Sequence, residues 1–235
     1  MDKGTLYLLP SLLSDGIVES VLPEGTLSII RKLDYFIVEE IRTARRFLIK
    51  AGIQKPIDTL NFSVFNEHSS DQDIVEYLAE AINGHDLGLL SEAGVPCVAD
   101  PGSLIVRTAH ELGIRVVPLT GPSSILLALM ASGFNGQNFA FLGYLPADKA
   151  LRARKIKEIE KTILEKDQTQ IFIETPYRNS PLFESLIRVC RPDTWLCLAT
   201  DLSGNNEVIK SHPIAEWRHL KPDLQKKPTI FLLYH

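Results

Sequence analysis

The chain has 235 residues, a charged fraction of 23% and a net charge of −4, as in an ordinary globular protein of one large or two modest domains. This acidic balance argues against broad electrostatic capture of nucleic acid but permits a local basic patch. Three cysteines without CxxC spacing predict reduced thiols and no metal site. No apolar window reaches the roughly 18 residues of a membrane span, and no signal peptide is evident, so we expect a soluble cytoplasmic protein without a membrane partner.

Apolar periodicity predicts strands and helices that alternate along the chain, which is typical of an α/β fold. The expected strands are residues 5–9, 35–38, 61–65, 87–90, 115–119, 139–142, 169–173, 195–199 and 227–234. The expected helices are residues 27–33, 39–52, 70–81, 104–112, 124–133, 149–166 and 180–189.

The stretch from Asp86 to Ser124 organises the rest. It contains a strand, a loop, a helix, a strand, a second loop and the start of a helix, which predicts a right-handed βαβ unit. Both loops follow the carboxyl ends of strands, where open α/β sheets bind ligands. The chain has no GxGxxG after its first strand, so a dinucleotide site is not indicated.

These two loops carry a family resemblance. Residues 91–96 (SEAGVP), 100–102 (DPG) and 121–123 (GPS) resemble the signature of the tetrapyrrole methylase superfamily, whose members are S-adenosylmethionine (SAM) dependent methyltransferases. Within it, the chain is most similar to the branch that methylates a ribose 2′-hydroxyl of small-subunit ribosomal RNA. The resemblance implies two α/β domains, residues 1–119 and 120–235, with the SAM cleft between them, and a homodimer.

Further segments resemble motifs of that branch, with departures. Pro10 is the one residue kept from a TPIGN-like loop, and residues 200–203 (TDLS) lack the arginine and lysine of an RELTK-like motif. The remaining similar segments are 39–43 (an AEDTR-like motif), 66–69 (HEHN-like), 143–146 (GFLP-like) and 174–178 (ESPHR-like).

The methyl carbon of SAM is already activated, so the enzyme's main task is to align it with the acceptor. Glycines 94 and 102 leave room for close backbone approach, and neighbouring backbone groups can bind adenosine and the amino-acid tail. The resemblance assigns the following residues to SAM: Leu9, Pro10, Gly94, Val95, Val98, Ser123, Ser124, Ile173, Glu174 and Thr229.

A hydroxyl acceptor loses a proton as it attacks, so a general base is required. Spacing singles out none of the candidates, which are Glu39, Glu40, Glu92, Asp100 and Glu174. The candidates for acceptor binding are Arg42, His68, Lys155 and Arg178.

Each polar motif also has a purely structural interpretation. Residues 39–46 are either a helix start, with acids near its positive end, or a charged rim beside the cofactor. His68 either is solvated or touches the substrate. The helix at 149–166 carries seven basic and four acidic residues if Asp148 is included, and is either a solvated surface or a phosphate-contacting face.

Three functions remain open. The first is methylation of a ribose 2′-hydroxyl in small-subunit ribosomal RNA. The second keeps SAM but changes the acceptor to a small molecule, tetrapyrrole-like or other, or to a different RNA site. The third is a catalytically idle SAM-binding protein.

Overall fold

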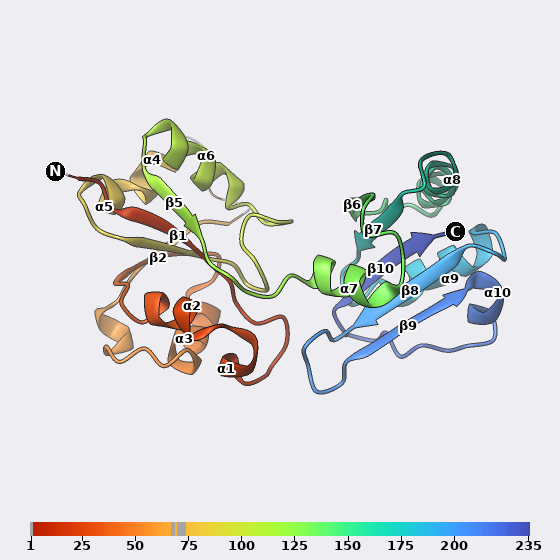
Figure 1. Ribbon diagram of the computed structural model, residues 1–235, viewed down its shortest axis with the longest axis horizontal. Helices are drawn as coiled ribbons and strands as arrows, with labels where there is room; N and C mark the ends of the chain where they lie inside the picture. Colours follow the sequence, from red (N-terminus) through yellow and green to blue (C-terminus); the bar gives the residue numbers. More distant parts are fainter. Residues whose placement is uncertain (1, 67–68, 70–73) are drawn as a thin grey trace. The chain divides into compact units, whose positions relative to one another are not determined.

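The computed structural model describes residues 2–66, 69 and 74–235, so His68 and the expected start of a helix at residue 70 lie outside the described part. The chain divides into two compact units, Met1–Ser123 and Ser124–His235 (Figure 1). Each unit contains one five-stranded sheet with helices against it, which confirms the predicted α/β class.

The sheet of the first unit is wholly parallel. In spatial order its strands are β3 (Asn61–Val64), β2 (Tyr35–Val38), β4 (Leu87–Leu90), β1 (Thr5–Leu9) and β5 (Arg115–Pro118). Because all five strands point the same way, the loops that follow them gather at one edge. The two loops singled out in the sequence therefore lie on either side of the loop after β1.

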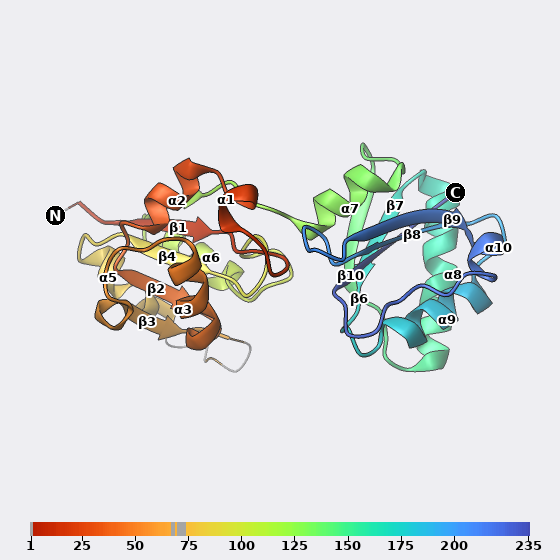
Figure 2. The ribbon, with the colours of Figure 1, turned by 90° about the horizontal axis from the view of Figure 1, so that it is seen from below.

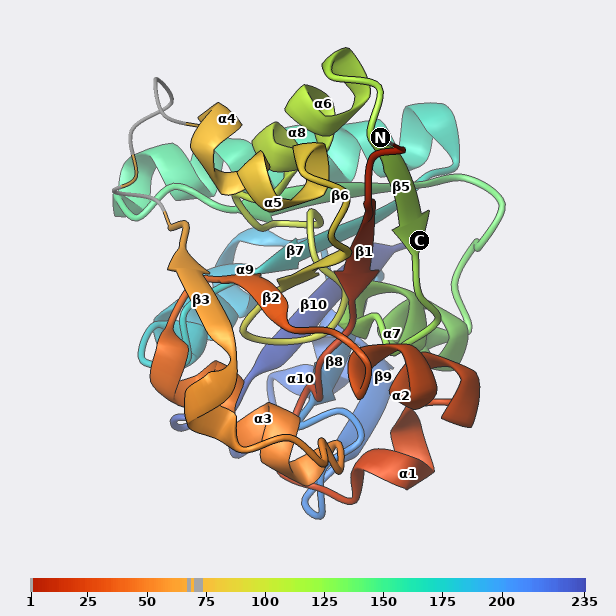
Figure 3. The same cartoon turned by 90° about the vertical axis from the view of Figure 1, so that its left-hand side faces the viewer.

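Helices cover both faces of this sheet (Figures 1 and 3). One face carries α1 (Val18–Val21), α2 (Glu24–Ile30) and α3 (Ile41–Lys50), and the other carries α4 (Ile74–Tyr77), α5 (Ala79–Ile82) and α6 (Ser103–Glu111). A 3₁₀ turn, η1 (Ile57–Thr59), precedes β3.

Successive residues of β2 alternate between the two cores, as the strand period of two requires. Phe36 and Val38 pack with α1–α3, whereas Ile37 packs with α4–α6. Strands buried on both faces explain the continuous apolar runs in the sequence.

The second unit has a mixed sheet. In spatial order its strands are β6 (Phe139–Tyr144), β7 (Thr169–Ile173), β10 (Thr229–Tyr234), β8 (Trp195–Thr200) and β9 (Val208–Pro213). The last strand, β10, runs antiparallel to both neighbours, and its first five residues are buried, as its apolar sequence predicts.

Helix α7 (Ser124–Ser132) packs on one side of this sheet, against β8, β9 and β10. The core on the other side is shared with α8 (Lys149–Lys166), α9 (Asn179–Val189) and α10 (Ile214–Trp217), as Figure 2 shows. Its centre includes the stacked rings of Phe172 and Phe231, 5.8 Å apart, and the buried Trp217, whose indole donates to the Leu196 carbonyl.

Sequence patterns missed four elements, namely α1, η1, β9 and α10. Three of them have only three or four residues, too few to show periodicity. Strand β9 lies at the edge of its sheet and is only partly buried, so its sequence (VIKSHP) is largely polar.

Candidate active site

Three loops meet at the carboxyl edge of the parallel sheet, after β1, β4 and β5. The Ser11 amide donates to the Gly94 carbonyl across 2.8 Å, which joins the first two loops. A Cβ on Gly121 would lie 2.2 Å from the Cβ of Pro10, so the third loop approaches as closely as a glycine permits. Pro10 and Gly94, two of the residues assigned to SAM, thus lie in one packed group of loops.

The loop after β4 is conformationally strained. Gly94 has a φ of +73°, and two non-glycine residues, Cys97 and Ala99, have φ of +68° and +59°. Each left-handed non-glycine residue costs roughly 1–2 kcal/mol, and such strain gathers at functional sites. Cys97 and Ala99 flank Val98, another SAM candidate, whose side chain is 47% exposed.

Three of the five candidate bases come together beside this loop. The Glu92 amide donates to Glu39 Oε1 at 3.3 Å, and a hydrogen bond joins the carboxyls of Glu39 and Asp100. Burial, followed by that hydrogen bond and the charge of Asp100, raises the pKa of Glu39 to about 7. A carboxylate with a pKa near neutrality is suited to accept a proton from a hydroxyl.

The other acids of the cluster are held by specific partners. Thr43 donates to Glu92 Oε1 at 2.6 Å, and the Gly102 amide donates to Asp100 Oδ1 at 2.7 Å. Glu40 has a different role, because its side chain caps α3 by accepting from the Arg42 amide at 2.8 Å. The helix-start interpretation therefore describes Glu40, whereas Glu39 belongs to the acidic cluster, and its position beside the cofactor stays a prediction.

In the second unit, the SAM candidates Ile173, Glu174 and Thr229 lie where β7 ends and β10 begins. Glu174 Oε1 accepts from Arg178 Nη2 at 2.6 Å, whereas Glu174 Oε2 is buried without a partner among the described residues. The Thr229 hydroxyl lies 3.3 Å from that of Thr200.

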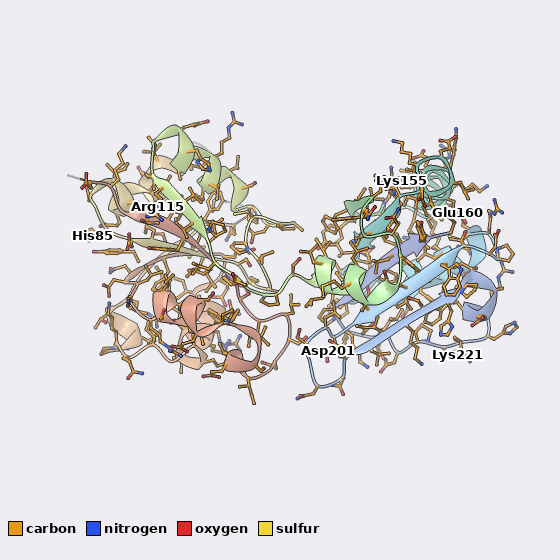
Figure 4. The ribbon with its side chains drawn as sticks, in the orientation of Figure 1. His85, Arg115, Lys155, Glu160, Asp201 and Lys221 are labelled. Atoms are coloured by element: carbon orange, nitrogen blue, oxygen red, sulfur yellow. The ribbon has the colours of Figure 1, made fainter. Side chains whose placement is uncertain are left out.

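The acceptor-binding candidates are dispersed. Arg42 is exposed at the start of α3, Arg178 is engaged by Glu174, and His68 is outside the described residues. Lys155 extends from α8, 3.5 Å from Glu158 (Figure 4). The sequence places Arg152 among the seven basic residues of the solvated or phosphate-contacting face of this helix, and for Arg152 that prediction is wrong.

Arg152 is only 3% exposed and faces the core of the second unit. Its guanidinium donates to the Ser185 hydroxyl at 3.1 Å and to the Ala147 carbonyl at 3.0 Å. It faces inward because position 152 lies one helical turn from Ile156 and two from Ile159, both of them buried.

Within residues 2–66, 69 and 74–235, no group of three His, Cys, Asp or Glu side chains is arranged to hold a metal ion. In that same part of the chain, no helix is long and apolar enough to cross a membrane. All three cysteines are free, and burial raises the pKa of the Cys97 thiol to about 12.

Comparison with known sequences decides the family. The profile described as "Tetrapyrrole (Corrin/Porphyrin) Methylases" matches residues 21–217, most of the chain. The chain belongs to the tetrapyrrole methylase family. It is therefore a SAM-dependent methyltransferase, as the loop motifs predicted.

Several bacterial relatives of this tetrapyrrole methylase bear the name "Ribosomal RNA small subunit methyltransferase I". The chain is 31% identical to the one from Pseudomonas aeruginosa, covering 92% of this chain and 72% of the relative. It is 34% identical to that of Xylella fastidiosa, with coverages of 90% and 73%. For Bacillus subtilis the identity is 31%, with coverages of 92% and 69%.

Solved structures agree on the fold of this tetrapyrrole methylase. The crystal structure of the methyltransferase CobJ matches with a TM-score of 0.65 and 16% identity, over 99% of this chain and 94% of the other. Uroporphyrin-III-C-methyltransferase from Thermus thermophilus matches with a TM-score of 0.57 and 17% identity, with coverages of 98% and 92%.

Sequence reasoning missed several polar residues around the candidate site. Ser11 and Thr43 lie in the TPIGN-like loop and the AEDTR-like segment but were not among the candidate residues, and only the fold brings them to Gly94 and Glu92. Asn179 donates to the Lys227 carbonyl at 2.8 Å. The two residues are 48 positions apart, so no local sequence pattern predicts this contact.

Proposed function

We propose that this protein transfers a methyl group from SAM to a ribose 2′-hydroxyl of small-subunit ribosomal RNA. The observation that carries the proposal is the identity of about 30% to relatives named for methylation of that RNA, over about nine-tenths of the chain. The acidic cluster around Glu39 supports a hydroxyl acceptor. A substrate of this kind places the protein with the ribosomal subunits, in the cytoplasm.

For SAM we propose backbone contacts from the loops after β4 and β5, at Gly94, Val95, Val98, Ser123 and Ser124. Leu9 and Pro10 complete the site on the first unit, and the family resemblance also assigns Ile173, Glu174 and Thr229 to SAM. The strain around Val98 and the unpartnered Glu174 Oε2 support these assignments. The buried carboxylate oxygen would accept a hydrogen bond from an amino group or a ribose hydroxyl of the cofactor.

Bound SAM supplies a methyl carbon on a sulfonium, which needs no further activation. With SAM bound, Glu39 would accept the 2′-hydroxyl proton as the methyl group passes to that oxygen. Burial and the neighbouring Asp100 together raise the pKa of Glu39 to about 7, and Thr43 holds Glu92 beside it. Arg42, His68, Lys155 and Arg178 are the side chains proposed to contact the acceptor.

One observation favours a second candidate, a SAM-dependent methyltransferase of a small molecule. The turn after β8, residues 200–203, carries no arginine or lysine where the RNA branch has both. Asp201 and Ser203 occupy it in left-handed conformations, with φ of 52° and 62°. This turn would therefore offer no positive charge to an RNA phosphate.

We also propose a homodimer. Leu126 and Met130 on α7 are 51% and 78% exposed, and Phe139 on the edge strand β6, the next element along the chain, is 39% exposed. Apolar groups of this size are suited to burial against a second copy. Sedimentation that shows only a monomer at micromolar concentration would rule the dimer out.

Transfer of labelled methyl groups tests the function. Isothermal titration first establishes SAM binding, and the purified protein is then given labelled SAM and 30S subunits from a strain that lacks the gene. Label in ribosomal RNA at a ribose supports the proposal. Label only in a small-molecule fraction supports the second candidate, and SAM binding without turnover on any acceptor supports the idle protein.

A further inference from the structure

A cavity of about 290 Å³ lies in the first unit, between the loop after β1 and helix α3. It is distinct from the contacts assigned above to SAM, since it contains none of those residues. Hydroxyl, cationic and acidic side chains dominate its polar lining: Ser11, Ser14, Asp15, Thr43, Arg46, Lys50 and Glu92.

The strongest sign that this cavity receives a ligand is Ser11. Its residue is 4% exposed, and its Oγ has no hydrogen-bond partner among the described residues. A buried hydroxyl without a partner costs free energy, so such atoms call for an explanation. A polar ligand in the cavity would supply the partner.

The cationic side of the cavity is available to an anion. Within residues 2–66, 69 and 74–235, Arg46 makes no ion pair but interacts with the charge of Asp15 at longer range, whereas the neighbouring Arg45 pairs with Asp58 at 3.2 Å. Lys50 pairs with Asp15 at 3.0 Å, but the Asp15 side chain is fully exposed. Exposed ion pairs contribute little, roughly 0–1 kcal/mol, so the singly charged phosphodiester of an RNA strand can replace Asp15 as the partner of Lys50.

The acidic side of the cavity lies near the N-terminal end of α3, where Thr43 and Glu92 line it. Thr43 and Glu92 are joined by a 2.6 Å hydrogen bond, and the Glu92 amide contacts Glu39. At 1.5 Å per residue, Arg46 lies about 4–5 Å and Lys50 about 10 Å further along α3 than Thr43. The cavity therefore offers an acceptor for hydroxyls near the candidate base and cations one to two turns away.

We propose that this cavity binds a ribose-phosphate unit of the RNA acceptor. Arg46, Lys50 and the Ser11 hydroxyl hold a phosphate, and Thr43 with Glu92 directs a ribose hydroxyl towards Glu39. The inference rests on the proposed function and adds the residues that seat the acceptor backbone. Because phosphate contacts carry no base information, this site positions the strand and does not read its sequence.

The test compares Arg46→Ala and Ser11→Ala with Arg107→Ala, a control that also removes one exposed arginine. Arg107 lies on α6, on the opposite face of the sheet, in an exposed pair with Glu111. Each protein is assayed for methyl transfer to 30S subunits as a function of substrate and salt concentration, and for SAM affinity by titration. We expect Arg46→Ala to raise KM for 30S subunits about tenfold and to lower the salt slope by about one. SAM affinity should stay within twofold of the parent.

Three results overturn the inference, and they are distinguishable. If the parent itself transfers no methyl to 30S subunits, the proposed function fails and the inference fails with it. If the parent is active and Arg46→Ala behaves as Arg107→Ala does, only the inference fails. If SAM affinity falls as much as KM rises, the cavity belongs to the cofactor and not to the acceptor.

Discussion

Replacing Gly94 tests the placement of SAM in the loop after β4. Its φ of +73° forces any side chain into the left-handed region, at a cost of roughly 1–2 kcal/mol. A new Cβ would also lie 2.9 Å from Leu13 Cδ2 and 3.2 Å from the Pro122 carbonyl oxygen. The leucine methyl can turn aside, but the carbonyl belongs to the backbone of the loop after β5, so that loop must shift.

We therefore expect Gly94→Ala to lose about 2 kcal/mol of unfolding free energy and Gly94→Val about 3 kcal/mol. A domain stable by about 5–15 kcal/mol stays folded after either change. The melting temperature of the first unit should fall by about 4–8 °C in Gly94→Ala. Affinity for SAM should fall at least tenfold, because the shift disturbs both loops proposed to hold the cofactor, and Ser11 through its bond to the Gly94 carbonyl.

Gly133 provides a matched control in the second unit. Its φ is +77°, yet a Cβ there would meet no atom within 4 Å. Gly133→Ala should thus lose about 1–2 kcal/mol of unfolding free energy for the same conformational reason, with no change in SAM affinity. Calorimetry with SAM on both folded variants decides the matter. If Gly94→Val binds SAM as tightly as Gly133→Ala does, the cofactor is not held by this loop.

Three further predictions concern charge. Burial raises the pKa of Glu39 to about 7 in the folded protein. The contribution of Glu39 to the free energy of unfolding is therefore complete below its ordinary pKa of 4.5 and is lost as the pH rises through about 7. In urea titrations, Glu39→Gln should gain stability relative to the parent between about pH 5 and pH 8. The methyl-transfer rate of the parent should rise through pH 7, and a Glu39→Gln variant that keeps this inflection and the parental rate would exclude Glu39 as the base. Lys155→Glu with Lys157→Glu should spare SAM binding and weaken RNA binding more strongly at low salt, as gel-shift titrations would show; equal binding at every salt concentration would leave α8 a solvated surface. Arg152→Ala should cost about 2–3 kcal/mol of unfolding free energy by removing charged hydrogen bonds to Ser185 and the backbone, and a loss under 1 kcal/mol in denaturant titration would contradict the buried role.

The centre of the first sheet could be predicted from the sequence because its strands β2 and β4 are buried on both faces. The runs at residues 35–38 and 87–90 are almost wholly apolar, since alternate residues serve different cores. The edge strand β9 gave no such signal, because its partly exposed face tolerates Lys210 and His212. The inward orientation of Arg152 agrees with its helical spacing to Ile156 and Ile159, but its residue type points the other way, because an arginine in a lysine-rich helix normally lies in solvent.

The candidate site was predictable only in part. Loop motifs pointed to Gly94 and to five acids, but spacing could not rank the acids. Their ranking depends on burial and on contacts across more than 50 residues, such as that of Glu39 with Glu92. The same contacts separate Glu39 from Glu40, which is next in the chain and caps a helix.

The altered loop after β1 illustrates why a motif can change while its geometry persists. That loop keeps only Pro10 of the RNA branch's pattern, and Pro10 is the residue against which Gly121 packs, with a hypothetical Cβ at 2.2 Å. A second link of this loop to the site is the Ser11 amide, which any residue except proline could provide. A third is the Leu13 side chain, whose Cδ2 would lie 2.9 Å from a Cβ at position 94. These three contacts hold the loop in place although most of its motif has changed. The side chains of residues 11–15 line the cavity beside α3, so we expect changes among them to alter what that cavity binds.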